Sequence, residues 1–163
     1  MKQGALAAIF DRGSILLIQR RDVPIWVLPG GGVDGDEDFH EAVLREVLEE
    51  TGLQVKVEHK VAVYLPQNRL ATPTHLFMCR FAGGNPKTGP ETANVRFFSI
   101  DALPDDLFHI HKEMIDIALK KCNYTHLILF SQITYLNLFK YLVRHPTRVF
   151  RFLLSKLGLP INA

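Results

Sequence analysis

The chain has 163 residues, of which 47% are hydrophobic and 22% are charged, with a formal net charge of +2. This size and balance predict a folded protein with one core and an extension, and exclude an intrinsically disordered chain. The two cysteines, Cys79 and Cys122, lack metal-ligand spacing, and the N-terminus shows no signal-peptide pattern. We therefore expect reduced, buried thiols in a cytoplasmic protein.

The first elements are strands. Residues 5–10 and 14–19 are apolar and flank the turn Asp11-Arg12-Gly13, which is typical of a hairpin. Arg20 and Arg21 follow the second strand. They could meet a phosphate or nucleotide, or form a solvated strand end, which we favour.

Residues 30–53 carry the most distinctive pattern. Glycines in residues 30–35 permit positive φ and close backbone approach to a ligand, and amides before a helix can hold an anion. Asp38 and Glu41 have capping-box spacing, and Gly52 is placed to end the helix. An apolar stripe is expected at Phe39, Val43 and Val47 and at Leu44 and Leu48.

The polar face of the same helix gathers acid. Glu46, Glu49 and Glu50 lie three and four residues apart, so their carboxylates share one side of the helix and repel one another. Arg45 can pair with Glu49 or Glu41. A hard divalent cation would balance the remaining charge; the alternative is an ordinary solvated acidic face.

This stretch resembles the signature of the Nudix hydrolases at every fixed position. The matching residues are Gly31, Glu37, Arg45, Glu46, Val47, Glu49, Glu50, Gly52 and Leu53. The resemblance implies that Glu46, Glu49 and Glu50 bind Mg²⁺ (or Mn²⁺), helped by the carbonyl of Gly30, and that Glu37 and Arg45 pair to brace the loop. Trp26 resembles a packing anchor for the loop, with stacking on a base as the alternative. Arg20, Trp26 and Gly31 are the candidate substrate contacts.

The next stretch mixes strands and loops. Residues 54–65 read as one or two strands, residues 74–81 as another, and residues 91–98 lead into a last strand; residues 66–73 and 83–90 read as loops. Residues 105–121 read as an amphipathic helix, on which His109 and His111 occupy different faces and are expected to be solvated or capping. By resemblance Glu91 is a candidate metal contact or general base, against a solvated loop acid. The order of elements, like the resemblance, implies an α/β/α sandwich around a mixed sheet.

We predict two parts: a Nudix hydrolase domain at 1–122 and a basic, apolar helical extension at 123–163. The extension contains five Lys or Arg and no acid, and all 17 Asp and Glu precede it. Residues 127–143 and 147–157 suggest two helices separated by His145-Pro146. Polar residues argue against a membrane span. Packing on the core or on a second subunit, peripheral contact with the inner membrane surface, and contact with another partner or a nucleic acid remain open; no stable DNA partner is expected.

The resemblance implies metal-dependent hydrolysis of the diphosphate linkage in a nucleoside diphosphate derivative, with a (d)NTP or a sugar nucleotide such as ADP-ribose as the favoured substrate. Glu46, Glu49, Glu50 and Glu91 are the candidate catalytic residues, and the sequence does not select the general base. The alternatives are a nucleotide-metabolite-binding regulator that cuts nothing and an RNA 5′-end pyrophosphohydrolase.

Overall fold

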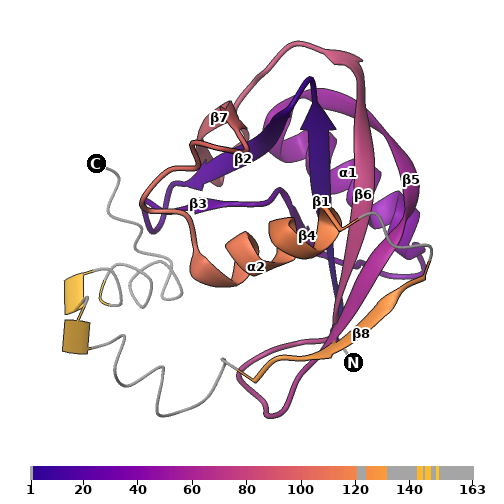
Figure 1. Cartoon of the computed structure of the whole chain (residues 1–163), viewed down its shortest axis with the longest axis vertical. Helices are drawn as coiled ribbons and strands as arrows, with labels where there is room; N and C mark the ends of the chain where they lie inside the picture. Colours follow the sequence, from indigo (N-terminus) through magenta and orange to yellow (C-terminus); the bar gives the residue numbers. More distant parts are fainter. Residues whose placement is uncertain (1, 121–123, 132–142, 145, 148–149, 151–163) are drawn as a thin grey trace.

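A mixed β-sheet forms the centre of the protein (Figure 1). The computed structural model describes residues 2–120, 124–131, 143–144, 146–147 and 150. Its strands are β1 (Gly4–Asp11), β2 (Ser14–Arg20), β3 (Trp26–Val27), β4 (Gly30–Gly32), β5 (Leu53–Leu65), β6 (Thr74–Gly84), β7 (Thr92–Ser99) and β8 (His126–Leu129). Its helices are α1 (Phe39–Thr51) and α2 (His109–Ala118).

The strand order is β3-β2-β1-β6-β5-β8, with β4 also paired to β1 and β7 to β2. β1 runs parallel to β6 and β5 runs parallel to β8, and the other pairs are antiparallel. The parallel β1–β6 pair sits in the middle of the sheet. β1 also holds the glycine strand β4 in register, with Ala5 opposite Gly31.

Each face of the sheet is covered by one helix and has its own core. Alternation along β1 sends Ala7 and Ile9 toward α1, where they pack with Val43 and Val47. Ala8 faces the opposite side, in the cluster that contains Met114 and Ile115 of α2. The predicted α/β/α sandwich is therefore confirmed (Figure 1).

The structure shortens the predicted helix at 105–121. The backbone of Trp26 accepts a hydrogen bond from Phe108 and donates one to Asp106, so the segment before His109 pairs with β3 instead of starting the helix. Lys121 lies outside the described residues. His111, expected to be solvated or capping, is instead half-buried and accepts a hydrogen bond from the amide of Leu28, and that expectation was wrong.

The apolar stripe expected on α1 is only partly buried. Val43 and Val47 are fully enclosed, but Leu44 and Leu48 are 42% and 52% exposed. The helix packs through one narrow face that Ala42, Val43 and Val47 supply. A second row of leucines beside this face meets solvent.

The expected helix from Leu127 also needs correction, because residues 126–129 form β8. The free edge of β5 offers backbone partners, and Ala62 to Leu65 pair with His126 to Leu129. Ile128 turns toward the core on the α2 side, whereas Leu127 and Leu129 remain 73% and 59% exposed. Most of the extension predicted beyond β8 lies outside the described residues. No described helix is long and apolar enough to cross a membrane.

Candidate active site

Helix α1 is held at both ends by the residues that its sequence indicated. The Asp38 carboxylate accepts hydrogen bonds from the amides of His40 and Glu41, and the Glu41 carboxylate accepts one from the Asp38 amide. Gly52 closes the helix with φ 69°, a left-handed conformation that favours glycine. The capping box and the glycine cap fix the length of the helix, and with it the direction in which its acidic face points.

Arg45 ties the helix to the glycine loop. Its Nη2 and Nε donate to the two carboxylate oxygens of Glu37 at 2.6 and 3.1 Å, and Nη2 also donates to the carbonyl of Gly32 at 2.9 Å. Glu37 in turn accepts a hydrogen bond from the amide of Asp34. Hydrogen bonding to Arg45 lowers the pKa of Glu37, so the pair stays charged. A planar fork between two charged groups holds the loop in one register.

The three helix carboxylates sit in different surroundings. Glu46 is half-buried, and its Oε1 lies 3.0 Å from Arg45 Nη1; Glu49 is exposed, with 3.5 Å between Oε2 and the same nitrogen. Glu50 accepts a hydrogen bond from the amide of Gly30 at 2.8 Å. Burial raises the pKa of Glu50 to about 7, and the negative charges of Glu46 and Glu91 add to this shift. Burial also raises the pKa of Glu46, against the opposing effect of Arg45.

Two glycines explain how close the loop and the helix approach. A Cβ at Gly31 would lie 2.5 Å from Oε1 of Glu46, so a side chain there would displace the carboxylate. Gly30 has φ 136°, and a Cβ there would collide with the backbone of Ala5 in β1. The amide of Gly30 can therefore reach Glu50 only because the residue is glycine.

The acidic residues surround a cavity of about 450 Å³, called the acidic cavity here. Glu46, Glu49, Glu50 and Glu91 all line it, so the structure brings together the predicted catalytic set. Asp34 is a further acid, and Arg20 and Arg45 are the two guanidinium groups in its wall. Five carboxylates against two cations leave a negative field in the cavity.

Arg20 and its neighbour Arg21 serve different purposes. The guanidinium of Arg20 pairs with Asp22 through two hydrogen bonds of 2.8 and 2.6 Å, yet its side chain keeps 41% exposure and lines the acidic cavity. Arg21 donates to the carbonyls of Pro90 and Thr92, and its amide donates to the carbonyl of Glu91. Arg21 therefore anchors the loop that carries Glu91 beside the cavity.

The donor set of the acidic cavity fits a divalent cation. Its ligands are oxygens, the preference of Mg²⁺, and its negative charge is incompletely balanced. Within the described part of the chain, no three Asp, Glu, His or Cys side chains already stand together as a metal cluster. Arg45 holds Glu46, and the amide of Gly30 holds Glu50. These carboxylates would therefore exchange their present contacts for a bound cation.

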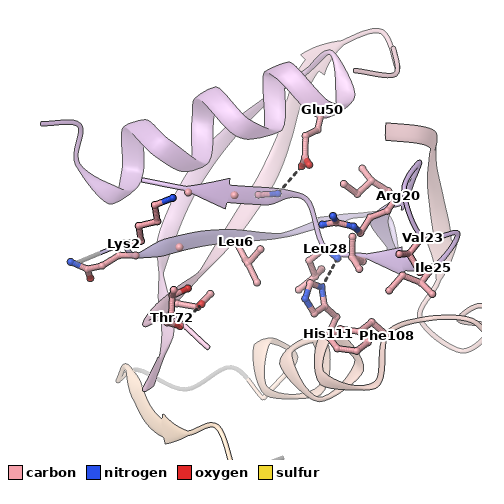
Figure 2. Close-up of a pocket in the computed structure, with 18 residues that line it drawn as sticks. Lys2, Leu6, Arg20, Val23, Ile25, Leu28, Glu50, Thr72, Phe108 and His111 are labelled. Atoms are coloured by element: carbon pink, nitrogen blue, oxygen red, sulfur yellow. Dashed lines mark hydrogen bonds between the residues drawn. The ribbon is translucent and has the colours of Figure 1, made fainter. Parts of the chain in front are cut away.

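A second cavity, of about 600 Å³, lies on the other side of the glycine strand and is called the apolar cavity here. The two cavities share Arg20, Glu50 and residues 30–32 as wall. Figure 2 shows the aliphatic side chains Leu6, Val23, Ile25 and Leu28 of its wall together with Phe108. Lys2, Gln3, Thr72 and Thr74 add polar groups. Aliphatic walls with a few polar groups are typical of sites for small organic ligands.

Sequence reasoning missed His111, which lines the apolar cavity and accepts a hydrogen bond from the amide of Leu28 at 2.8 Å (Figure 2). The signal was present, because His111 falls four residues after Leu107 and three before Met114, within the apolar stripe of the helix.

Trp26, proposed as a substrate contact, packs edge-on against Phe98 at 4.7 Å between ring centroids and lines neither cavity. This position favours the packing alternative.

The chain is similar to several known proteins. The family model described as NUDIX domain matches residues 1–116. A putative 8-oxo-dGTP diphosphatase of Bacillus subtilis (strain 168) is 40% identical over 104 residues, which are 63% of this chain and 69% of that protein. An ADP-ribose pyrophosphatase of Methanocaldococcus jannaschii is 36% identical over 107 residues, which are 62% of this chain and 63% of that protein. About a third of each relative thus lies outside the match.

Solved structures agree with this result. The crystal structure of an ADP-ribose pyrophosphatase from Streptococcus suis aligns with a TM-score of 0.68 and 33% identity. That alignment covers 77% of this chain and 98% of the other. The similarity therefore extends over about three quarters of this chain and nearly the whole of that structure.

Proposed function

Because the chain belongs to the NUDIX family of pyrophosphohydrolases, we propose that it cleaves the diphosphate linkage of a (d)NTP or of a nucleoside diphosphate sugar such as ADP-ribose, with Mg²⁺ as cofactor. The observation that carries the proposal is the shared wall of the two cavities. A molecule that joins a charged diphosphate to an aromatic or sugar group matches an acidic cavity beside an apolar one. Two relatives are named for 8-oxo-dGTP and for ADP-ribose, and both of these compounds are molecules of this kind.

The acidic cavity supplies the chemistry in this proposal. Glu46, Glu49 and Glu50 would hold Mg²⁺, or Mn²⁺ in its place, with the carbonyl of Gly30 as a further oxygen. A bound divalent ion supplies charge neutralisation at the phosphate oxygens and acidifies a water. Arg20 would bind the phosphate that points toward the apolar cavity, since it lines both cavities.

Two carboxylates are candidates for accepting the proton of the attacking water. Glu50 has a pKa of about 7, which suits proton exchange near neutral pH, but its Gly30 contact and its proposed ligand role compete with that task. Glu91 lines the same cavity from an exposed loop that Arg21 anchors. We propose Glu91 as the general base, because it faces the cavity from outside the helix.

A phosphate-release screen tests this function. Purified protein with Mg²⁺ or Mn²⁺ is offered nucleoside triphosphates, ADP-ribose, other sugar nucleotides, dinucleoside polyphosphates and 5′-triphosphate RNA, and the products are separated by chromatography. We expect turnover of a (d)NTP or a sugar nucleotide that chelation of the metal abolishes. Tight binding of a nucleotide without any turnover would overturn the hydrolase proposal and favour the regulator alternative.

The partner of the extension stays a prediction. Leu127 and Leu129 of β8 give the sheet an exposed apolar edge next to a basic stretch of sequence. The rest of the extension, a second subunit or an anionic membrane would each cover such an edge. Light scattering of the purified protein and pelleting with vesicles of anionic lipid distinguish the three alternatives. A dimer supports the second subunit, and pelleting supports the membrane. A monomer that does not pellet supports packing of the extension on its own chain.

A further inference from the structure

His111 presents a fixed hydrogen-bond donor to the apolar cavity. Its Nδ1 accepts the Leu28 amide at 2.8 Å, so the proton of the neutral ring must sit on Nε2. Burial lowers the pKa of His111 to about 3, and the nearby charge of Arg20 contributes. The ring therefore keeps one tautomer at neutral pH, with Nδ1 as acceptor and Nε2 as donor.

The Nε2 donor has no partner among the residues that the structure describes. Its ring belongs to the wall of the apolar cavity, which Val27, Leu28 and Phe108 also line. An N–H group in such surroundings loses its hydrogen bond to water when a ligand enters, and the loss is costly unless the ligand supplies an acceptor. The cavity thus selects for a ligand atom with a lone pair at this point.

We propose that His111 is a specificity-determining residue, which donates Nε2–H to a carbonyl oxygen of the nucleobase and so favours oxo bases over amino bases. The proposal rests on the proposed function, because it assumes that the nucleoside part of the substrate occupies the apolar cavity. A base with a carbonyl group, such as guanine, hypoxanthine or uracil, satisfies the donor. The adenine of ADP-ribose does not, so the inference narrows the proposed substrates to those that carry an oxo base. An exocyclic amino group at the same place would set donor against donor and leave both unpaired.

Two variants separate the two ring nitrogens. In His111→Asn the side-chain oxygen can replace Nδ1 as the acceptor for Leu28, but the side chain ends short of the position of Nε2. In His111→Gln the amide nitrogen can reach the position of Nε2 and keep the donor. His109→Asn is the matched control, because His109 is an exposed histidine of the same helix that lines neither cavity.

Calorimetry with inosine and adenosine 5′-monophosphates measures the selection without any need for turnover, because the two bases differ by a carbonyl and an amino group at one carbon. We expect the wild-type protein to bind the inosine nucleotide about tenfold more tightly, a ratio that one hydrogen bond in an apolar site can supply. The ratio should fall toward one in His111→Asn, and remain in His111→Gln and His109→Asn. Ring ¹⁵N NMR of the unliganded protein should show the proton of His111 on Nε2.

Equal affinity of the wild-type protein for both nucleotides, an unchanged ratio in His111→Asn, or a proton on Nδ1 would each overturn the proposal. The failure of the proposed function gives a different pattern: no nucleotide is hydrolysed with Mg²⁺, while the binding ratio still depends on His111. Turnover without any dependence on His111 overturns only the present inference. Thermal unfolding of each variant shows whether the domain remains folded during these measurements.

Discussion

The acidic cavity and the apolar cavity share a wall but are encoded in different ways. The acids of the first come mainly from one stretch of the chain, with Glu46, Glu49 and Glu50 on consecutive turns of α1. The second is assembled from β1, β2, β3, the glycine strand, the loop before β6 and the start of α2. The first can be recognised in a linear pattern because helical periodicity fixes which residues meet. The second forms only when these separate segments come together in the folded protein.

The largest expected effect tests the acidic cavity. Glu50→Gln should reduce kcat by about 100-fold or more, because a charged ligand in a preorganised site is lost. The same change should leave the free energy of unfolding in metal-free buffer unchanged or higher, since it removes a buried charge that is incompletely balanced. Steady-state kinetics and urea unfolding measure the two quantities.

Asp116→Asn is the control for that experiment, because Asp116 is an exposed acid of α2 that lines neither cavity. It should alter neither kcat nor stability. If Glu50→Gln retained wild-type turnover, the acidic cavity would not be the metal site.

Glu50 in the acidic cavity and His111 in the apolar cavity should also make the free energy of unfolding depend on pH in opposite directions. Burial raises the pKa of Glu50 to about 7, above the unfolded value, so its folded state binds the proton more strongly and stability is lost as the pH rises toward 7. Burial lowers the pKa of His111 to about 3, below its unfolded value of 6.5, so stability is lost as the pH falls below about 6.5. Each slope approaches but does not exceed about 1.4 kcal/mol per pH unit.

Urea unfolding with a metal chelator at pH 5, 6 and 7 checks both slopes. The stability of the wild type relative to Glu50→Gln should increase as the pH falls, whereas its stability relative to His111→Asn should decrease. Taking differences between variants cancels the other groups that titrate in this range, such as His75, whose pKa burial also lowers. Parallel curves for all three proteins would contradict the buried positions of both groups.

The sequence predicted the fold and the acidic cavity for a shared physical reason. Local patterns indicated Asp38 and Gly52 as the helix ends, and the alternation of residues 54–65 indicated the strand that follows α1. The 105–121 helix was placed too early because a segment that could be helical pairs with β3 instead, and nothing local signals that choice. Leu127 was read as helical for the same reason, since the open edge of β5 is a property of the folded sheet.

Specificity was harder to predict, because the apolar cavity is built from ordinary core residues. Leu6, Val23 and Leu28 have the same sequence pattern as aliphatic residues that fill the interior. His111 lay within an apolar stripe, but a histidine there was interpreted as a surface residue. A polar residue inside an apolar helical stripe is the one local sign of the cavity that the sequence contained.

A smaller effect is expected where the loop meets the helix. Arg45→Lys keeps the charge but cannot form the fork to Glu37 and Gly32, so the glycine loop should lose its register. We expect kcat/KM to fall about tenfold, as for a small misplacement of reacting groups. Arg80→Lys is the control, since Arg80 makes a single surface contact of 3.6 Å with Glu58, and such pairs contribute little. Equal kinetics for both variants would show that the fork is dispensable.

The smallest expected effect tests the apolar cavity through its wall. Val23→Ala removes two methyl groups that face the ligand space and should raise KM about fivefold, while kcat stays near the wild-type value. Val61→Ala is a matched control: Val61 and Val23 are 5% and 7% exposed, but Val61 lines neither cavity. Both variants should lose comparable stability by urea unfolding. If both raised KM equally, the effect would come from general loosening of the core, and the proposal that the apolar cavity binds the substrate would be wrong.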